Sequence, residues 1–315
     1  MMKILQNIFS IQDYGETHHL LRLFGLKIKF PKKEFEEKRK ENPYYYYKKN
    51  NIDITTIPPA TGQIRDIQLA NLALLKELDY VCKQNNLQYW LDFGTLMGAV
   101  RHKGYIPWDD DIDVSMLRED YEKLLEVFSS ATRNPDIYAE LEKASTKVCR
   151  VAIKIRHKCC PHLFIDVFPD DVYYAQLSEK EQKIKTDELK EVHIKLQKEL
   201  QNSDKNSAYR IYKKAILGNM PNNTNVENPN ILMGMDFYHT REYWIYDNEI
   251  FFPLQDMEFE GFNFPAVREA DYYLKKLYGD YMTYPKKIGF GHNIYKTLSE
   301  DDKKVIEELK ESLNV

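Results

Sequence analysis

Apolar side chains recur at helical spacing along the stretch that begins near residue 64. The stripe consists of Ile64, Ile67, Leu74, Leu75, Leu78 and Val81 and runs to Cys82. Positions three and four apart share one face of a helix, so this pattern predicts a helix packed against a core. Asn71 is the one polar gap in the stripe.

The rest of the chain alternates between strand patterns and helical patterns. Strands are expected at 88–93, 111–115, 147–155 and 162–168, with helices at 95–101 and 118–129. Residues 178–217 are rich in Lys and Glu and predict helix, followed by a polar loop to 230. Strand-like runs at 249–252 and 257–264 and helices at 267–278 and 298–313 complete the series. This mixture predicts an α/β (α+β) fold, a mixed sheet core with flanking helices and a helical insertion.

The pattern divides the chain into three parts. Residues 1–62 are expected to form an N-terminal appendage, 63–297 the core domain with its insertion at about 178–230, and 298–315 a C-terminal helix. Within the appendage, residues 21–30 alternate apolar and basic side chains, which favours a short strand or hairpin. A peripheral contact with a membrane surface is the alternative. Residues 32–42 form a charged helical segment.

Composition narrows the class of protein. The chain has 315 residues, a net charge of -4 and 30% charged residues, typical of a folded soluble protein. A charge so near neutral gives no overall field to attract nucleic acid, so we expect no nucleic-acid partner. No apolar run approaches the roughly 20 residues that cross a bilayer. We therefore expect a cytoplasmic protein, or one peripheral at the inner face of the membrane.

Cys159 and Cys160 are adjacent and lie between His157 and His162, so a zinc site has to be considered. Structural zinc sites normally combine two separated pairs of ligands, and no second pair is visible in the sequence. Four cysteines are also too few for a disulfide framework in a chain of this length. Reduced thiols are the favoured interpretation.

The most informative chemistry is the acidic run around Asp111. On a strand, Asp109, Asp111 and Asp113 share one face, and three crowded carboxylates repel unless a cation lies among them. Oxygen ligands select a hard ion, so the pattern predicts Mg²⁺ or Mn²⁺. A solvated acidic loop is disfavoured because apolar residues flank the run. A calcium loop of the EF-hand type is excluded because Val114 and Asp120 stand where it needs Gly and Glu.

Two further features belong with this run. Gly94 and Thr95 lie between a predicted strand and a helix, where bare backbone amides and the helix dipole favour phosphate. Asp166 is the one carboxylate in an apolar strand, and a buried acid needs a partner. A metal shared with the acidic run is one explanation, and a salt bridge to Lys154 or Arg156 is the other.

Together these residues resemble the LicD family, which includes bacterial phosphocholine transferases and, more distantly, fukutin-related sugar-modifying enzymes. The resemblance rests on Tyr89-Trp90, Gly94-Thr95-Leu96, Gly98-Ala99-Val100-Arg101, Ile106 to Asp113, Phe164 to Pro169 and Tyr278 to Met282, with Pro285 and His292 following. It covers roughly residues 65–170 and 235–295. The first sixty residues and the helical insertion lie outside it.

The resemblance implies a nucleotidyltransferase-like core that binds a CDP-linked donor with Mg²⁺ or Mn²⁺. Such enzymes transfer phosphocholine or a phospho-alditol to a hydroxyl of a glycan or lipid-linked glycan, as in lipopolysaccharide or capsule biosynthesis, and release CMP. It implies Asp111 and Asp113 as paired metal ligands and Asp166 as the third carboxylate, with Asp109 assisting. Gly94 and Thr95 would hold donor phosphates, Arg101 and Lys154 would clamp them, and His292 would close the donor site. Asp166 is also the candidate for deprotonating the acceptor, since spacing does not separate a ligand from a base.

Two other functions remain alternatives. A glycosyltransferase could use the Asp-x-Asp to bind the metal of a nucleotide sugar, but such folds usually place a nucleotide-binding βαβ unit before it. Here an appendage and one helix precede the motif. A non-enzymatic scaffold is the second alternative, and the intact carboxylate set argues against it.

Overall fold

The computed structural model describes residues 9–14, 18–23, 26–31, 43–145, 149–221, 225–234, 245–286, 288 and 298–314. The chain separates into two compact units, Met1–Ile57 and Pro58–Val315. The first unit holds a three-stranded antiparallel sheet in the order β1-β2-β3. Its elements are β1 (Phe9–Tyr14), β2 (His18–Leu23), β3 (Leu26–Pro31), α3 (Pro43–Lys49) and the short 3-10 helix η1 (Ile54–Thr56). The predicted hairpin at 21–30 is confirmed by β2 and β3, whereas residues 32–42 lie outside the described part.

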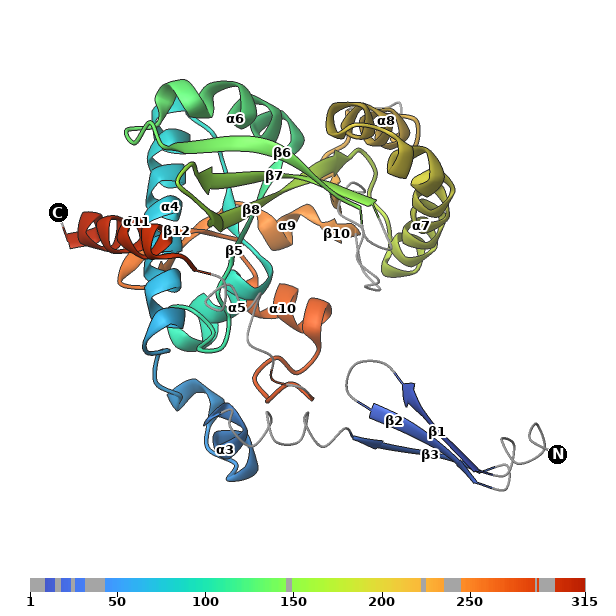
Figure 1. Cartoon of the computed structure of the whole chain (residues 1–315). Helices are drawn as coiled ribbons and strands as arrows, with labels where there is room; N and C mark the ends of the chain where they lie inside the picture. The colour runs from blue at the N-terminus through green and yellow to red at the C-terminus, as the bar shows by residue number, and fades with distance from the viewer. Residues whose placement is uncertain are drawn as a thin grey trace. The chain divides into compact units, whose positions relative to one another are not determined.

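The second unit is built on a nine-stranded mixed sheet (Figure 1). Seven strands follow the order β10-β9-β8-β5-β4-β12-β11, and β7 and β6 continue from β8. The strands are β4 (Trp90–Leu91), β5 (Ile112–Leu117), β6 (Ile137–Ser145), β7 (Cys149–His157), β8 (Cys160–Tyr173), β9 (Asn230–Met233), β10 (Ile245–Asp247), β11 (Gln255–Phe259) and β12 (Phe262–Ala266). β5 runs parallel to β8, and β12 parallel to β4. The predicted mixed α/β fold is confirmed.

Helices cover this sheet in groups (Figure 1). Helices α4 (Gln63–Asn85) and α6 (Arg118–Ala131) contact each other and the central strands β5 and β8. Helix α5 (Phe93–His102) packs on β5 and on α10 (Ala270–Tyr278), while α7 (Glu179–Asn202) and α8 (Lys205–Leu217) pack on β7. Helix α11 (Glu300–Glu311), followed by η3 (Ser312–Asn314), lies against α4, where Lys310 forms an ion pair with Asp66 at 2.6 Å. None of the described helices is both long and apolar enough to span a membrane.

The structure differs from the sequence pattern in several elements. Residues 249–252 do not form a strand: helix α9 (Asn248–Phe251) occupies them, and one helical turn buries Ile250 and Phe251. The strand expected at 88–93 shortens to β4, because Asp92 already caps helix α5. The predicted insertion divides into α7 and α8, since Asp204 caps a new helix through the amides of Asn206 and Ser207.

Two more differences concern strands. The run at 257–264 is a hairpin, β11 and β12, that turns at Glu260 and Gly261, both with positive φ. Strand β6 was not predicted, although it pairs with β7 along its full length.

The helix α5 packs closely against the loop that leads to the acidic run. A side-chain carbon added at Gly98 would lie 2.4 Å from the carbonyl oxygen of Gly104 and 3.1 Å from the amide nitrogen of Ile106. Both neighbours are backbone atoms, so they cannot turn aside as a side chain would. Glycine at 98 therefore sets the distance between helix and loop.

We predict that Gly98→Ala lowers the free energy of unfolding by about 1–3 kcal/mol, the usual range for overpacking. Gly218→Ala is the matched control, because its added carbon meets its nearest neighbour, the Lys214 carbonyl oxygen, at 3.3 Å and its φ is -68°. Urea denaturation of both variants measures the difference. Equal stability of Gly98→Ala and the wild-type protein would contradict the close packing.

Candidate active site

The acidic run and the lone strand aspartate converge on one pocket. In the register of the parallel pair, Asp113 of β5 lies directly beside Asp166 of β8. One carboxylate oxygen from each of Asp111, Asp113 and Asp166 lies within 4.8 Å of the others. Asp109, Asp110 and Asp111 form a second such group, so Asp111 belongs to both. The structure therefore brings Asp111, Asp113 and Asp166 together as predicted. Strand β5 begins only at Ile112, however, so Asp109 and Asp111 lie in the loop before it and do not share a strand face with Asp113.

The pocket has a volume of about 440 Å³. Its lining combines the carboxylates with two cations, aromatic rings and small residues: Phe93, Gly94, Asp109, Asp111, Asp113, Glu142, Ala144, Arg150, Ala152, Lys154, Asp166, Phe168 and Tyr278. Four of these, Glu142, Ala144, Arg150 and Ala152, were not singled out in the sequence. All four lie on β6 and β7, and the pairing of these two strands brings them to the pocket wall.

Glycine at 94 allows the helix terminus to approach the carboxylates. A side-chain carbon at this position would lie 3.1 Å from Oδ2 of Asp109 and 3.9 Å from Oδ2 of Asp113. Bare backbone at a helix N-terminus is a favourable surface for an anion. Gly94 thus leaves open the space between the start of α5 and the acidic groups, as the phosphate-binding hypothesis requires.

The start of α5 is tied to β5 by backbone and side-chain hydrogen bonds. The amide of Asp92 donates to the Asp113 carbonyl at 3.1 Å, and the amide of Asp113 donates to Oγ1 of Thr95 at 2.8 Å. Thr95 thus binds the strand that carries Asp113 and does not line the pocket. Its predicted contact with a donor phosphate stays a prediction.

The buried side chain of Asp92 accepts three hydrogen bonds, a role that was not predicted from the sequence. Its Oδ1 accepts from the amide of Phe93 at 2.6 Å and from the phenol of Tyr273 at 2.7 Å, and its Oδ2 accepts from Oγ of Ser115 at 2.6 Å. Phe93 has a φ of 44°, a left-handed conformation that is unfavourable for an aromatic residue. The three bonds to Asp92 hold this turn, which is where strand β4 becomes helix α5.

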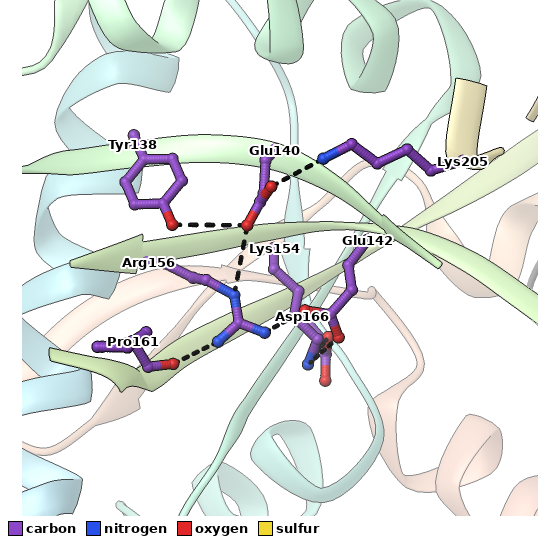
Figure 2. Close-up of polar contacts among 8 residues, drawn as sticks. All are labelled: Tyr138, Glu140, Glu142, Lys154, Arg156, Pro161, Asp166 and Lys205. Carbon is purple, nitrogen blue, oxygen red and sulfur yellow. Dashed lines mark hydrogen bonds and ion pairs between the residues drawn. The ribbon is translucent and has the colours of Figure 1, made fainter. Parts of the chain in front are cut away.

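Lys154 reaches the acidic group from strand β7, directly opposite Asp166. Its Nζ lies 2.7 Å from Oδ1 of Asp166 and 4.0 Å from Oε1 of Glu142 (Figure 2). The ammonium also stands 3.6 Å from the ring centroid of Phe164. The salt bridge considered as the alternative partner for Asp166 therefore exists, and it coexists with the carboxylate cluster.

A ladder of charged side chains supports Lys154. Figure 2 shows Arg156 bonded to Glu140 and Glu142 of β6, and Lys205 bonded to Glu140. Arg156 also donates to the Pro161 carbonyl. Arg156 is thus engaged with Glu140 and Glu142, whereas Lys154 pairs with Asp166 of the carboxylate cluster.

Burial and the negative charges of the neighbouring carboxylates raise the pKa of Asp113. The pKa of Asp113 is raised well above 3.8, first by burial and then by the negative charges of Asp111, Asp166 and Asp109. A divalent cation relieves both effects, and the ligand set here offers oxygen atoms only. The residues present therefore fit a hard ion such as Mg²⁺ or Mn²⁺.

Arg101 lies outside this pocket lining. Its Nη1 donates to the Tyr281 carbonyl at 2.6 Å, and its guanidinium stands 5.8 Å from the ring centroid of Trp108. Burial lowers its pKa to about 10, so it stays charged at neutral pH. Burial and then the charge of Arg101 lower the pKa of the neighbouring His102 to about 3, so that ring is neutral. His292 lies outside the described residues.

The region around Cys159 gives no support to a zinc site. The four cysteines are free thiols, with Cys159 exposed and Cys160 buried. Within the described ranges, the groups of His, Cys, Asp and Glu close enough to hold a metal are the two aspartate groups around Asp111.

Comparison with known proteins matches the central part of the chain to one family. Residues 86–202 match the family model for the LicD/FKTN/FKRP nucleotidyltransferase domain. A stretch of 114 residues is 36% identical to the lipopolysaccharide cholinephosphotransferase LicD of Haemophilus influenzae, covering 33% of this chain and 43% of that protein. An uncharacterized protein of Rickettsia typhi is 32% identical over 107 residues, 32% of this chain and 34% of its own length.

A shorter match concerns a mammalian enzyme. Ribitol 5-phosphate transferase FKRP of Mus musculus is 45% identical over 40 residues, 13% of this chain and 8% of that protein. The matched stretches span less than half the length of each of these relatives. The family model covers the turn at Gly94, the acidic run and strand β8, which are the elements that build the pocket. Residues 86–202 of this chain are thus a domain of the LicD family, with fukutin-related proteins among its relatives.

Proposed function

We propose that this chain is a divalent-cation-dependent transferase. It moves a phospho-substituent of the phosphocholine or phospho-alditol type from a CDP-linked donor to a hydroxyl of a cell-surface glycan precursor, and CMP is released. The observation that carries the proposal is the convergence of Asp111, Asp113 and Asp166 beside Gly94, within a LicD-family domain. The relatives include a cholinephosphotransferase and a ribitol 5-phosphate transferase, which supports the class of transferred group.

The chain's own residues would divide the work as follows. Asp111, Asp113 and Asp166, assisted by Asp109, would hold Mg²⁺ or Mn²⁺. When bound, such an ion neutralises charge on the donor pyrophosphate and on the departing CMP. The backbone at Gly94 would bind a phosphate oxygen at the N-terminus of α5.

Three more side chains would have roles at this site. Lys154 lines the pocket beside Asp166, and its ammonium would leave that carboxylate to bind a phosphate oxygen of the donor. Asp166 would also lower the cost of deprotonating the acceptor hydroxyl. Arg101 would act through the backbone at Tyr281, whose carbonyl it holds.

Three aromatic residues line the same pocket, Phe93, Phe168 and Tyr278. Phe93 and Phe168 meet edge to face, with ring centroids 5.2 Å apart. Aromatic faces attract quaternary ammonium groups. Within the proposal, this lining places CDP-choline first among the donors to be tested.

We predict that the full chain with Mg²⁺ releases CMP from one of CDP-choline, CDP-glycerol and CDP-ribitol. Asp111→Asn should slow that release by at least about 100-fold, because a group that stabilises transition-state charge is typically worth this much. Chromatographic measurement of CMP and UDP, with UDP-sugars in parallel reactions, follows both products. UDP release without CMP release would support the alternative, a glycosyltransferase using its Asp-x-Asp.

We also predict a pH-dependent stability effect at Asp113. Because its folded-state pKa is raised above 3.8, its contribution to stability is present below that pH and is lost as pH rises through the raised pKa. Without Mg²⁺ at pH 7.5, Asp113→Asn should therefore be more stable than wild type by about 1–2 kcal/mol. Mg²⁺ at about 100 times its Kd should stabilise the wild type by about 2.7 kcal/mol and the variant much less.

Thermal unfolding between pH 4 and 8, with and without Mg²⁺, tests both parts of this prediction. Asp136→Asn serves as control, since Asp136 is about half exposed and lies outside the pocket, 3.7 Å from Lys158. A Mg²⁺ response in Asp113→Asn as large as that of the wild type would argue against Asp113 as a ligand.

A further inference from the structure

Helix α4 presents a row of polar side chains at three-residue spacing: Arg65, Gln68 and Asn71. Gln68 and Asn71 have no exposed surface at all. Asn71 is the polar gap in the apolar stripe of this helix. Burying an amide is costly unless it forms hydrogen bonds, so each of these side chains should have a specific partner.

The partners lie in the loop that carries the acidic run. Nε2 of Gln68 donates to the Asp109 carbonyl at 2.8 Å, and Nδ2 of Asn71 donates to the Asp110 carbonyl at 2.8 Å. Successive polar residues on the helix thus bind successive carbonyls of the loop.

Arg65 extends the same row toward the start of the loop. It forms two hydrogen bonds with Glu260, at 2.9 and 2.6 Å, and Glu260 accepts from the amide of Tyr105 at 3.0 Å. The helix therefore fixes the loop at residues 105, 109 and 110.

These hydrogen bonds from α4 are made to loop residues that form no ladder with a neighbouring strand in the part of the chain that the structure describes. The ladder between β5 and β8 begins at Ile112, so Asp109 and Asp110 precede it. The carboxylates of Asp109 and Asp111 depend on the backbone path of this segment, and α4 supplies the hydrogen bonds that a neighbouring strand would otherwise give. A displacement of about 1 Å in such a segment is enough to spoil a binding geometry.

Asn71 imposes a cost on the fold. Its Oδ1 is buried and has no hydrogen-bond partner among the described residues. An unsatisfied buried acceptor destabilises the folded state. Leucine is larger but has the same branched shape, so it would remove that cost and continue the apolar stripe. The fold alone therefore gives little reason for an amide here, whereas the position of the Asp110 carbonyl does.

We propose that Asn71 and Gln68 are positioning residues for the carboxylate site. Through the carbonyls of Asp109 and Asp110 they preset the loop, so that its carboxylates meet Asp113 and Asp166. This inference rests on the divalent-cation site of the proposed function. It goes beyond that site because neither residue touches the ion or the substrate.

The test is Mn²⁺ affinity of the full chain, followed by the EPR signal of free Mn²⁺, in parallel with thermal unfolding of the metal-free protein. Asn71→Leu should bind Mn²⁺ at least about 10-fold more weakly, as is usual when a group that orients a metal ligand is lost. Its metal-free unfolding midpoint should equal or exceed that of the wild type. A purely structural role predicts the reverse, a lower midpoint and an unchanged affinity.

Thr186→Val is the matched control. Oγ1 of Thr186 in α7 is likewise buried and has no hydrogen-bond partner in the described part of the chain. This variant should keep the wild-type Mn²⁺ affinity. Gln68→Met repeats the test independently, because it removes the bond to the Asp109 carbonyl at nearly constant volume.

The outcomes separate this inference from the proposed function. If the wild type fails to bind Mn²⁺, the cation site itself is wrong. If the wild type binds and both α4 variants bind equally well, the positioning role is wrong and the cation site stands. An unfolded Asn71→Leu protein would show that the amide is structural and would overturn its assignment, leaving Gln68→Met to decide for Gln68.

Discussion

The arrangement of the candidate site has to overcome the mutual repulsion of its carboxylates. Asp111, Asp113 and Asp166 bring oxygen atoms within 4.8 Å of one another. At 4 Å, two unit charges in surroundings with an effective dielectric constant near 20 repel by about 4 kcal/mol. Such a group persists only if the surrounding fold holds it rigidly and its charge is offset, by Lys154, by protonation of Asp113 or by a bound cation.

The fold holds the group from three directions. The parallel register of β5 and β8 sets Asp113 beside Asp166. The hydrogen bonds that Asp92 and Thr95 form with the backbone of Asp113 join the start of α5 to β5. The side-chain amides of Gln68 and Asn71 in α4 bind the loop before β5. Lys154 contributes a positive charge from β7. Each restraint involves a different element, which explains why the site needs a mixed sheet with helices packed on it.

Much of this could be predicted from the sequence, because the signals were local. Helices α4 and α6 follow from apolar spacing, and the alternation of Asp109, Asp111 and Asp113 pointed to a shared site. Strand β6 was missed although Ile137, Ala139 and Leu141 alternate with polar residues in it, a period that could have revealed it. Helix α9 was mistaken for a strand because three consecutive apolar residues, Ile250 to Phe252, have no readable period.

Long-range partners could not be predicted. Asn71 was visible as a polar gap, but its partner carbonyl lies 39 residues away along the chain. Likewise Thr95 was expected to hold phosphate, and its bond to the amide of Asp113 arises only when α5 and β5 meet. Arg101 was placed among phosphate ligands by motif, whereas it binds the carbonyl of Tyr281, 180 residues later. A sequence states which groups are present, and packing decides which of them meet.

A crystal structure of the full chain with Mn²⁺, examined by anomalous scattering, would show directly whether these carboxylates bind a divalent ion. We expect an anomalous peak among Asp111, Asp113 and Asp166, with carboxylate oxygens at roughly 2.0–2.2 Å, as small hard divalent cations require. Absence of a peak there at saturating Mn²⁺, with these side chains in the positions described, would contradict that expectation.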